Sequence, residues 1–272
     1  MAAAAQPRHA LAAHAANYFE IAEAKLIEDE KLKEGTLTKF SGFPFGFDRP
    51  YTYLEGKRIL ALARAELINC RDLVKEVGMN PAMPGRPAIT GRQSPGVWDF
   101  LSLAPSEDDG PFTDHPHLTL SIDSRPVEAM VTIPHNVNAL MRRNLRSLKE
   151  AGFQSLIGDV VTRMKPLLQT EKGATPWFRG LQRRYPSQRA APFNDARIEF
   201  DLRTAIEGGP PKTQPKWLAA YGAFVEKEGS NYQIQVGVAF RYEACPGLRA
   251  ESAIDLLEQA WLACKPLIDL AR

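Results

Sequence analysis

Hydrophobic and polar residues alternate along four segments in the second half of the chain, with the period of two expected of half-buried β-strands. The segments 118–122 and 127–133 stand on either side of a short Ser-Arg-Pro turn and predict a hairpin. The same alternation returns at 198–203 and 233–241. Clean alternation is typical of antiparallel strands that pack on one face only. We therefore expect an antiparallel sheet of about four strands.

Other segments carry apolar residues at the helical period of 3.6. The strongest of them runs from Glu55 to Val77 and is followed by Gly78 and Pro81, which are typical of a helix end. Further helices are predicted at 17–34, 138–149, 153–168, 217–228 and 250–270. The order of elements predicts an α+β fold, in which helices pack on one face of the sheet and a helical N-terminal region precedes it.

The composition changes between the first helices and the first predicted strand. Residues 81–116 hold seven of the chain's 21 prolines and four glycines, as expected of a connector or a lid. Within this stretch, residues 97–103 (VWDFLSL) could form a short anchoring helix. The predicted organisation is a helical N-terminal region (1–80), a Pro/Gly-rich connector or lid (81–116) and an α+β domain (117–272).

Composition narrows the class of protein further. The chain has 272 residues, 44% hydrophobic and 24% charged, with a net charge of +2, which is typical of a globular protein. Its three widely spaced cysteines (Cys70, Cys245 and Cys264) predict reduced thiols. The alanine-rich N-terminus is too interrupted for a signal peptide. Apolar residues never form a run of 18. We therefore expect a cytoplasmic protein with no membrane partner.

One short sequence carries candidate chemistry. His117 is followed by Leu118 and Thr119 at the start of a predicted strand, and this His-x-Thr resembles one half of the motif of the 2H phosphoesterases. In that family two such strands place two histidines across a phosphate, so the resemblance implies acid–base roles for His117 and Thr119. A second copy is not found, because His135-Asn-Val lacks the hydroxyl. A structural histidine at a strand entrance is the alternative interpretation.

Metal sites and cofactor motifs find little support. Asp114, His115 and His117 could share a metal, but Pro116 interrupts the strand geometry and no further ligand pair follows. Four acids, Asp123, Glu128, Glu199 and Asp201, are predicted on the polar sheet face, where Arg203 could neutralise them. Glycine-rich phosphate loops and hydrolase signature motifs do not occur. We expect no metal and no cofactor.

Charge is strongly segregated along the chain. Residues 141–190 carry eleven basic residues against three acidic ones, a net charge of +8, whereas residues 99–130 carry −6. The basic segment is rich in arginine and contains aromatic residues, a composition suited to phosphate contacts and base stacking. The predicted contact residues are Arg142, Arg143, Arg146, Arg179, Arg183, Arg184 and Arg189.

Three functional hypotheses follow. The first is a nucleic-acid-binding or accessory protein that contacts RNA or DNA through the basic segment. The second is a phosphoesterase or nuclease that uses His117 and the sheet carboxylates. The third is a non-catalytic subunit of a complex, with a protein partner at the Pro-rich or basic segment. The basic segment could equally face the chain's own acidic segment.

Overall fold

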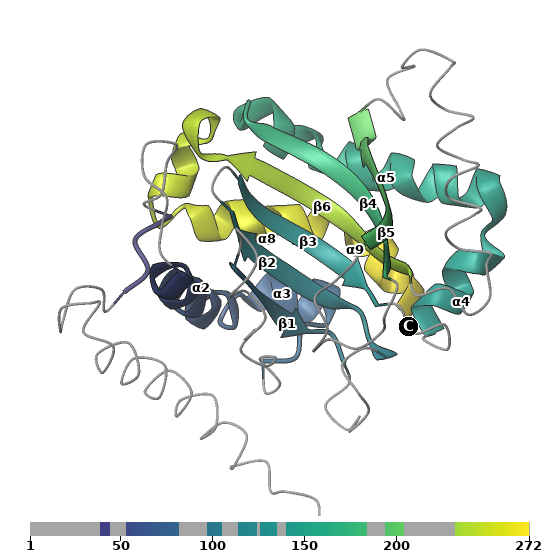
Figure 1. The fold of residues 1–272 in the computed structure, drawn as a ribbon, viewed down its shortest axis with the longest axis horizontal. Helices are drawn as coiled ribbons and strands as arrows, with labels where there is room; N and C mark the ends of the chain where they lie inside the picture. The colour runs from purple at the N-terminus through teal and green to yellow at the C-terminus, as the bar shows by residue number, and fades with distance from the viewer. Residues whose placement is uncertain are drawn as a thin grey trace, which may run out of the picture.

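The computed structural model describes residues 39–43, 53–81, 97–104, 114–123, 126–134, 140–183, 194–203 and 232–271. Within these residues it is an α+β structure built on an open antiparallel sheet of six strands (Figure 1). The strands are β1 (Val97–Ser102), β2 (His117–Ile122), β3 (Pro126–Ile133), β4 (Ala174–Arg183), β5 (Asn194–Asp201) and β6 (Tyr232–Arg241). Their order across the sheet is β1-β2-β3-β6-β4-β5, so β6 lies between β3 and β4.

The α+β class and the antiparallel sheet are confirmed, but the predicted count of four strands is too low. Strand β1 lies where residues 97–103 were predicted to be helical. Its alternation was hidden because Trp98 and Phe100 make the second face apolar as well, while Asp99 stands on the helix-covered face. Strand β4 lies in the arginine-rich segment, where no strand was predicted.

Strand β4 forms although it contains a proline and a glycine, because it pairs with a strand on each side, β6 and β5. Pro176 lies opposite Val238 of β6 but one residue beyond the stretch that pairs with β5. A proline at that position therefore removes no bond of the β4–β5 ladder. Tertiary pairing thus overrides a weak local preference for strand.

The helices are α2 (Tyr53–Leu67), α3 (Arg71–Val77), α4 (Leu140–Ser147), α5 (Lys149–Thr170), α8 (Ala253–Ala263) and α9 (Lys265–Ile268), followed by the 3-10 turn η4 (Asp269–Ala271). The single helix predicted at 55–77 is in fact two helices, α2 and α3. The predicted end at Gly78 is confirmed, because Gly78 adopts a left-handed conformation with φ 67° and its N–H donates to Leu73. The helices predicted at 17–34 and 217–228 lie outside the described residues.

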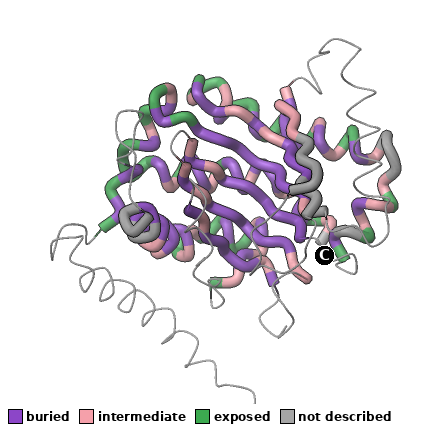
Figure 2. The backbone as a smooth tube through the Cα atoms, in the orientation of Figure 1, coloured by how far each residue is buried: buried purple, intermediate pink, exposed green. Residues whose placement is uncertain are grey.

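One hydrophobic core joins the helices to the sheet. Helix α2 packs on β1 and β2, α8 on β3 and β6, and α5 on β4, all on the same face (Figure 1). The core includes residues from Phe40 to Ile268, so α2 and α3 share it with the sheet. Figure 2 shows the consequence, with buried residues along the strands and exposed ones along the outer sides of the helices.

Specific polar contacts fix two helices against the sheet. Arg64 of α2 forms a buried ion pair with Asp99 of β1, with 3.0 Å between Nη1 and Oδ2. Trp261 of α8 donates from its indole N–H to the backbone carbonyl of Met130 in β3, at 3.2 Å. Within the described part of the chain, no helix is long and apolar enough to cross a bilayer.

Candidate functional site

A line of polar side chains crosses the sheet on the face opposite the helices. Each strand contributes one residue, and each residue is the direct cross-strand partner of the next. Five of the six are buried, and Glu199 is half-buried. We call this set the polar row; in the order of the strands it consists of Ser102, His117, Thr132, Gln235, Arg179 and Glu199.

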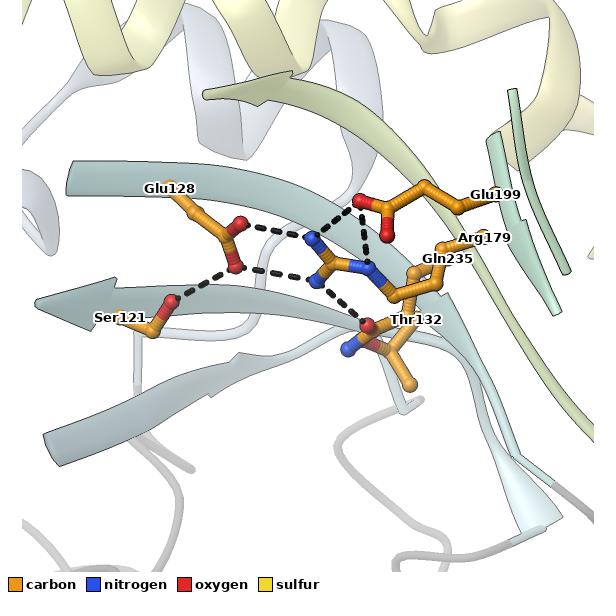
Figure 3. Close-up of polar contacts among 6 residues, drawn as sticks. All are labelled: Ser121, Glu128, Thr132, Arg179, Glu199 and Gln235. Atoms are coloured by element: carbon orange, nitrogen blue, oxygen red, sulfur yellow. Dashed lines mark hydrogen bonds and ion pairs between the residues drawn. The ribbon is translucent and has the colours of Figure 1, made fainter. Parts of the chain in front are cut away.

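Arg179 is the centre of the interactions in the polar row (Figure 3). Its guanidinium donates to both carboxylate oxygens of Glu128, at 2.7 and 3.0 Å, and to Oε1 of Glu199, at 2.9 and 3.3 Å. Burial by itself would lower the pKa of Arg179, but the hydrogen bonds and charges of the two glutamates outweigh it and hold that pKa above its usual value. The three charges together amount to −1, so this group does not attract anions.

Arg179 reaches Glu128 across an intervening strand. Glu128 belongs to β3, and β6 lies between β3 and β4. Where the path crosses β6, Gly237 carries no side chain. A Cβ atom at Gly237 would collide with the backbone carbonyl of Ala129. The glycine therefore allows β3 and β6 to approach closely and leaves room above β6.

Hydrogen bonds extend the network towards β2. Gln235 accepts from Arg179 Nη1 at 3.4 Å and donates from Nε2 to Thr132 Oγ1 at 3.1 Å, which fixes the orientation of its amide. The hydroxyls of Thr132 and Thr119 are 2.6 Å apart. Ser121 donates to Glu128 at 3.1 Å. The sequence did not single out Thr132 or Gln235, although their alternating positions on β3 and β6 would have placed them on this face.

His117 lies in the same row, between Ser102 and Thr132. It is buried, and its ring centroid is 5.0 Å from that of Phe100. Burial lowers the pKa of His117 to about 4, so the imidazole is neutral at neutral pH. The structure places His117 and Thr119 on one face, as the 2H resemblance requires, while the second histidine considered, His135, lies outside the described residues.

The carboxylates expected on this face are largely engaged in ion pairs. Glu128 and Glu199 hold Arg179, and Asp201 pairs with Arg203 at 2.6 Å. The described residues contain no group of three or more histidines, cysteines or acids that could hold a metal ion. Through Arg179, Glu128 and Glu199 connect strands β3, β4 and β5.

The arginines predicted to contact nucleic acid are found in several settings. Arg179 belongs to the polar row. Arg142, Arg143 and Arg146 lie on α4, where Arg143 is exposed and Arg146 half-buried. Arg183 ends β4, and Arg184 and Arg189 lie outside the described residues.

Helix α4 presents one side to the protein and another to solvent. Met141 and Leu145 are buried, and Leu148, just beyond the helix, is half-buried. Leu140, the first residue of the helix, is 43% exposed. By helical spacing of about 100° per residue, positions 142, 143 and 146 fall within one arc on the side away from Met141. The helix contains no acidic residue.

Comparison with known proteins adds no functional assignment. No protein-family model matches the chain, and no curated protein or solved structure gives a significant match.

Proposed function

We propose that the protein is a nucleic-acid-binding or accessory protein that works through the basic residues of α4 and of the neighbouring end of the sheet. The observation that supports this proposal is topological. The two separated parts of the basic segment, α4 and the end of β4, emerge at the same end of the sheet.

The strand register establishes that common end. Ile133, the last residue of β3, and Gly180, near the end of β4, both pair with Ile234 of β6. Helix α4 starts seven residues after Ile133, a separation that a chain can span over at most about 25 Å. Figure 1 shows α4 at this end of the molecule. Arg183 pairs with Asn194, so the β4–β5 connection also leaves and re-enters the sheet here.

Exposure and charge fit a surface that contacts phosphates. Arg143 is exposed, and no ion pair within the described chain involves it. Arginine side chains bind phosphate oxygens through forked hydrogen bonds. Arg179, by contrast, directs its guanidinium to Glu128 and Glu199 and supports the sheet instead. Binding through α4 would involve mainly the nucleic-acid backbone, with little sequence preference and a steep salt dependence.

The proposal is tested by fluorescence-anisotropy titration of single- and double-stranded RNA and DNA at several salt concentrations. We expect affinity to fall steeply with salt. Charge reversal of Arg142, Arg143 and Arg146 to glutamate should abolish binding at moderate salt. Circular dichroism of the variant verifies that the fold is retained.

A matched control reverses three cations elsewhere on the helices, Arg71, Lys75 and Arg163, all of which are exposed. This control has the same net charge as the α4 variant and should keep most of the binding. Equal losses in both variants would show that only overall charge matters. The absence of salt-sensitive binding by the wild type would overturn the proposal in favour of a protein partner. Cleavage of the nucleic acid that disappears in His117→Ala would favour the phosphoesterase hypothesis.

A further inference from the structure

The helix that carries the predicted arginines cannot hold its shape alone. Helix α4 has eight residues, and isolated helices of this length are marginal in water. Its N-terminal turn also lacks the acidic residues that would stabilise a helix start. Its helical form therefore depends on its neighbours in the structure, which include α5 one residue further along the chain.

The principal neighbour of α4 is the 3-10 turn η4. Met141 and Leu145 of α4 are fully buried, and Leu270 of η4 is packed against the core. Asn144 donates from Nδ2 to the backbone carbonyl of Leu270 at 2.5 Å, a direct polar link between residues far apart in the sequence. We call this pair the Asn144–Leu270 clasp.

The turn η4 follows directly on a buried part of the chain. Leu267 and Ile268, immediately before it, are buried in the core. Lys265 of α9 and Asp269 of η4 form a partly exposed ion pair at 2.8 Å. The clasp thus connects a short helix to a turn that is anchored by the core residues before it.

We infer that the Asn144–Leu270 clasp is a conformational control point that keeps α4 helical and its arginines on one side. This inference rests on the proposed function for its consequence in binding, but not for its structural part. Asn144 is a positioning residue, because it lies about 160° around the helix from Arg146 and faces η4. When the clasp opens, the arginines lose their common side and binding weakens.

The test compares Asn144→Ala with Asn144→Gln, which keeps an amide donor, in the full-length chain. The control is Ser147→Ala, which removes an exposed hydroxyl that donates to the carbonyl of Asn144 in the same helix. Hydrogen exchange of the α4 amides is measured without nucleic acid. Binding of a double-stranded DNA and a single-stranded RNA is measured in parallel.

We expect exchange in α4 to be about fivefold faster in Asn144→Ala, as for the loss of one hydrogen bond, with partial rescue in Asn144→Gln and little change in Ser147→Ala. Binding should weaken in the same order. Unchanged exchange in Asn144→Ala would overturn the clasp. Faster exchange with undiminished binding would overturn its control of binding. If the wild type binds no nucleic acid while exchange still responds, the proposed function fails and the structural part of the clasp stands.

Discussion

Arg179 of β4 donates from the same Nη2 atom to Glu128 at 2.7 Å and to Glu199 at 2.9 Å. Glu128 belongs to β3 and Glu199 to β5, two strands that are separated by β6 and β4. One guanidinium therefore ties together strands that share no backbone hydrogen bond. These hydrogen bonds span the half of the sheet that contains β4, the strand whose own sequence gives the weakest indication of a strand.

Removal of this arginine should destabilise the protein strongly. In Arg179→Met the carboxylates of Glu128 and Glu199 would stay largely buried without a counter-charge, at a cost of about 3 kcal/mol in the free energy of unfolding. Urea denaturation at pH 7 measures the change. The triple variant with Glu128→Gln and Glu199→Gln should recover much of the loss, because no uncompensated charge is left. A single variant as stable as the wild type would show that the network contributes nothing.

Removal of Arg64 should also destabilise the protein, because Arg64 of α2 forms a buried ion pair with Asp99 of β1. Both side chains are less than 10% exposed. Arg64→Met should cost about 3 kcal/mol, since it leaves the Asp99 carboxylate without its cation. Arg64→Met combined with Asp99→Asn should cost less than Arg64→Met alone, and thermal denaturation of the single and double variants measures this coupling. Additive losses would indicate that the two residues act independently.

His117 should make stability depend on pH. Its pKa is about 4 in the folded protein and about 6.5 in an unfolded chain, so only the unfolded state takes up a proton between these values. This difference in pKa adds about 3 kcal/mol to the free energy of unfolding above pH 6.5. The contribution is lost as the pH falls towards 4. Urea denaturation of the wild type and of His117→Asn from pH 4 to 7.5 measures it. The difference between the two proteins should shrink or reverse on acidification; a constant difference would contradict the assigned pKa.

Two glycines should respond in opposite ways to alanine. Gly237→Ala would place a methyl group against the backbone of β3 and should prevent normal folding or lower the melting temperature severely. Gly158 lies within α5, and a Cβ atom there meets no atom within 4 Å. Gly158→Ala should therefore stabilise the protein by about 1 kcal/mol through helix propensity. Calorimetry of the two variants provides the comparison, and equal melting temperatures would refute the argument for Gly237.

The parts of the fold that could be predicted are those where one face is buried and the other is polar. Strands β2, β3, β5 and β6 follow this rule and were found from their alternation. Strand β1 was missed because apolar residues occupy both of its faces. Strand β4 was missed because it is specified by its two neighbours, and a single sequence does not show which strands will be neighbours.

The site was predicted in the same uneven way. The period of two predicts the face of each strand residue, and Glu128 and Glu199 do lie on the predicted polar face, together with His117 and Thr119. The pairing of the acids with Arg179 was not predicted, because Arg179 was assigned to a basic surface on the grounds of composition. Which charges meet depends on strand order, and that order brings Arg179 to Glu128, 51 positions earlier in the sequence.

The position of β6 has a consequence for how the chain folds. Residues 232–241 complete the ladders of both β3 and β4, although about one hundred residues separate β6 from β3 in the sequence. During synthesis on the ribosome, β3 and β4 thus emerge long before the strand that joins them. Contacts of such sequence separation slow folding, and unpaired strand edges expose the nascent chain to aggregation. We expect the sheet to form completely only after β6 has left the ribosome, so residues 232–241 determine when the ladders of β3 and β4 are joined.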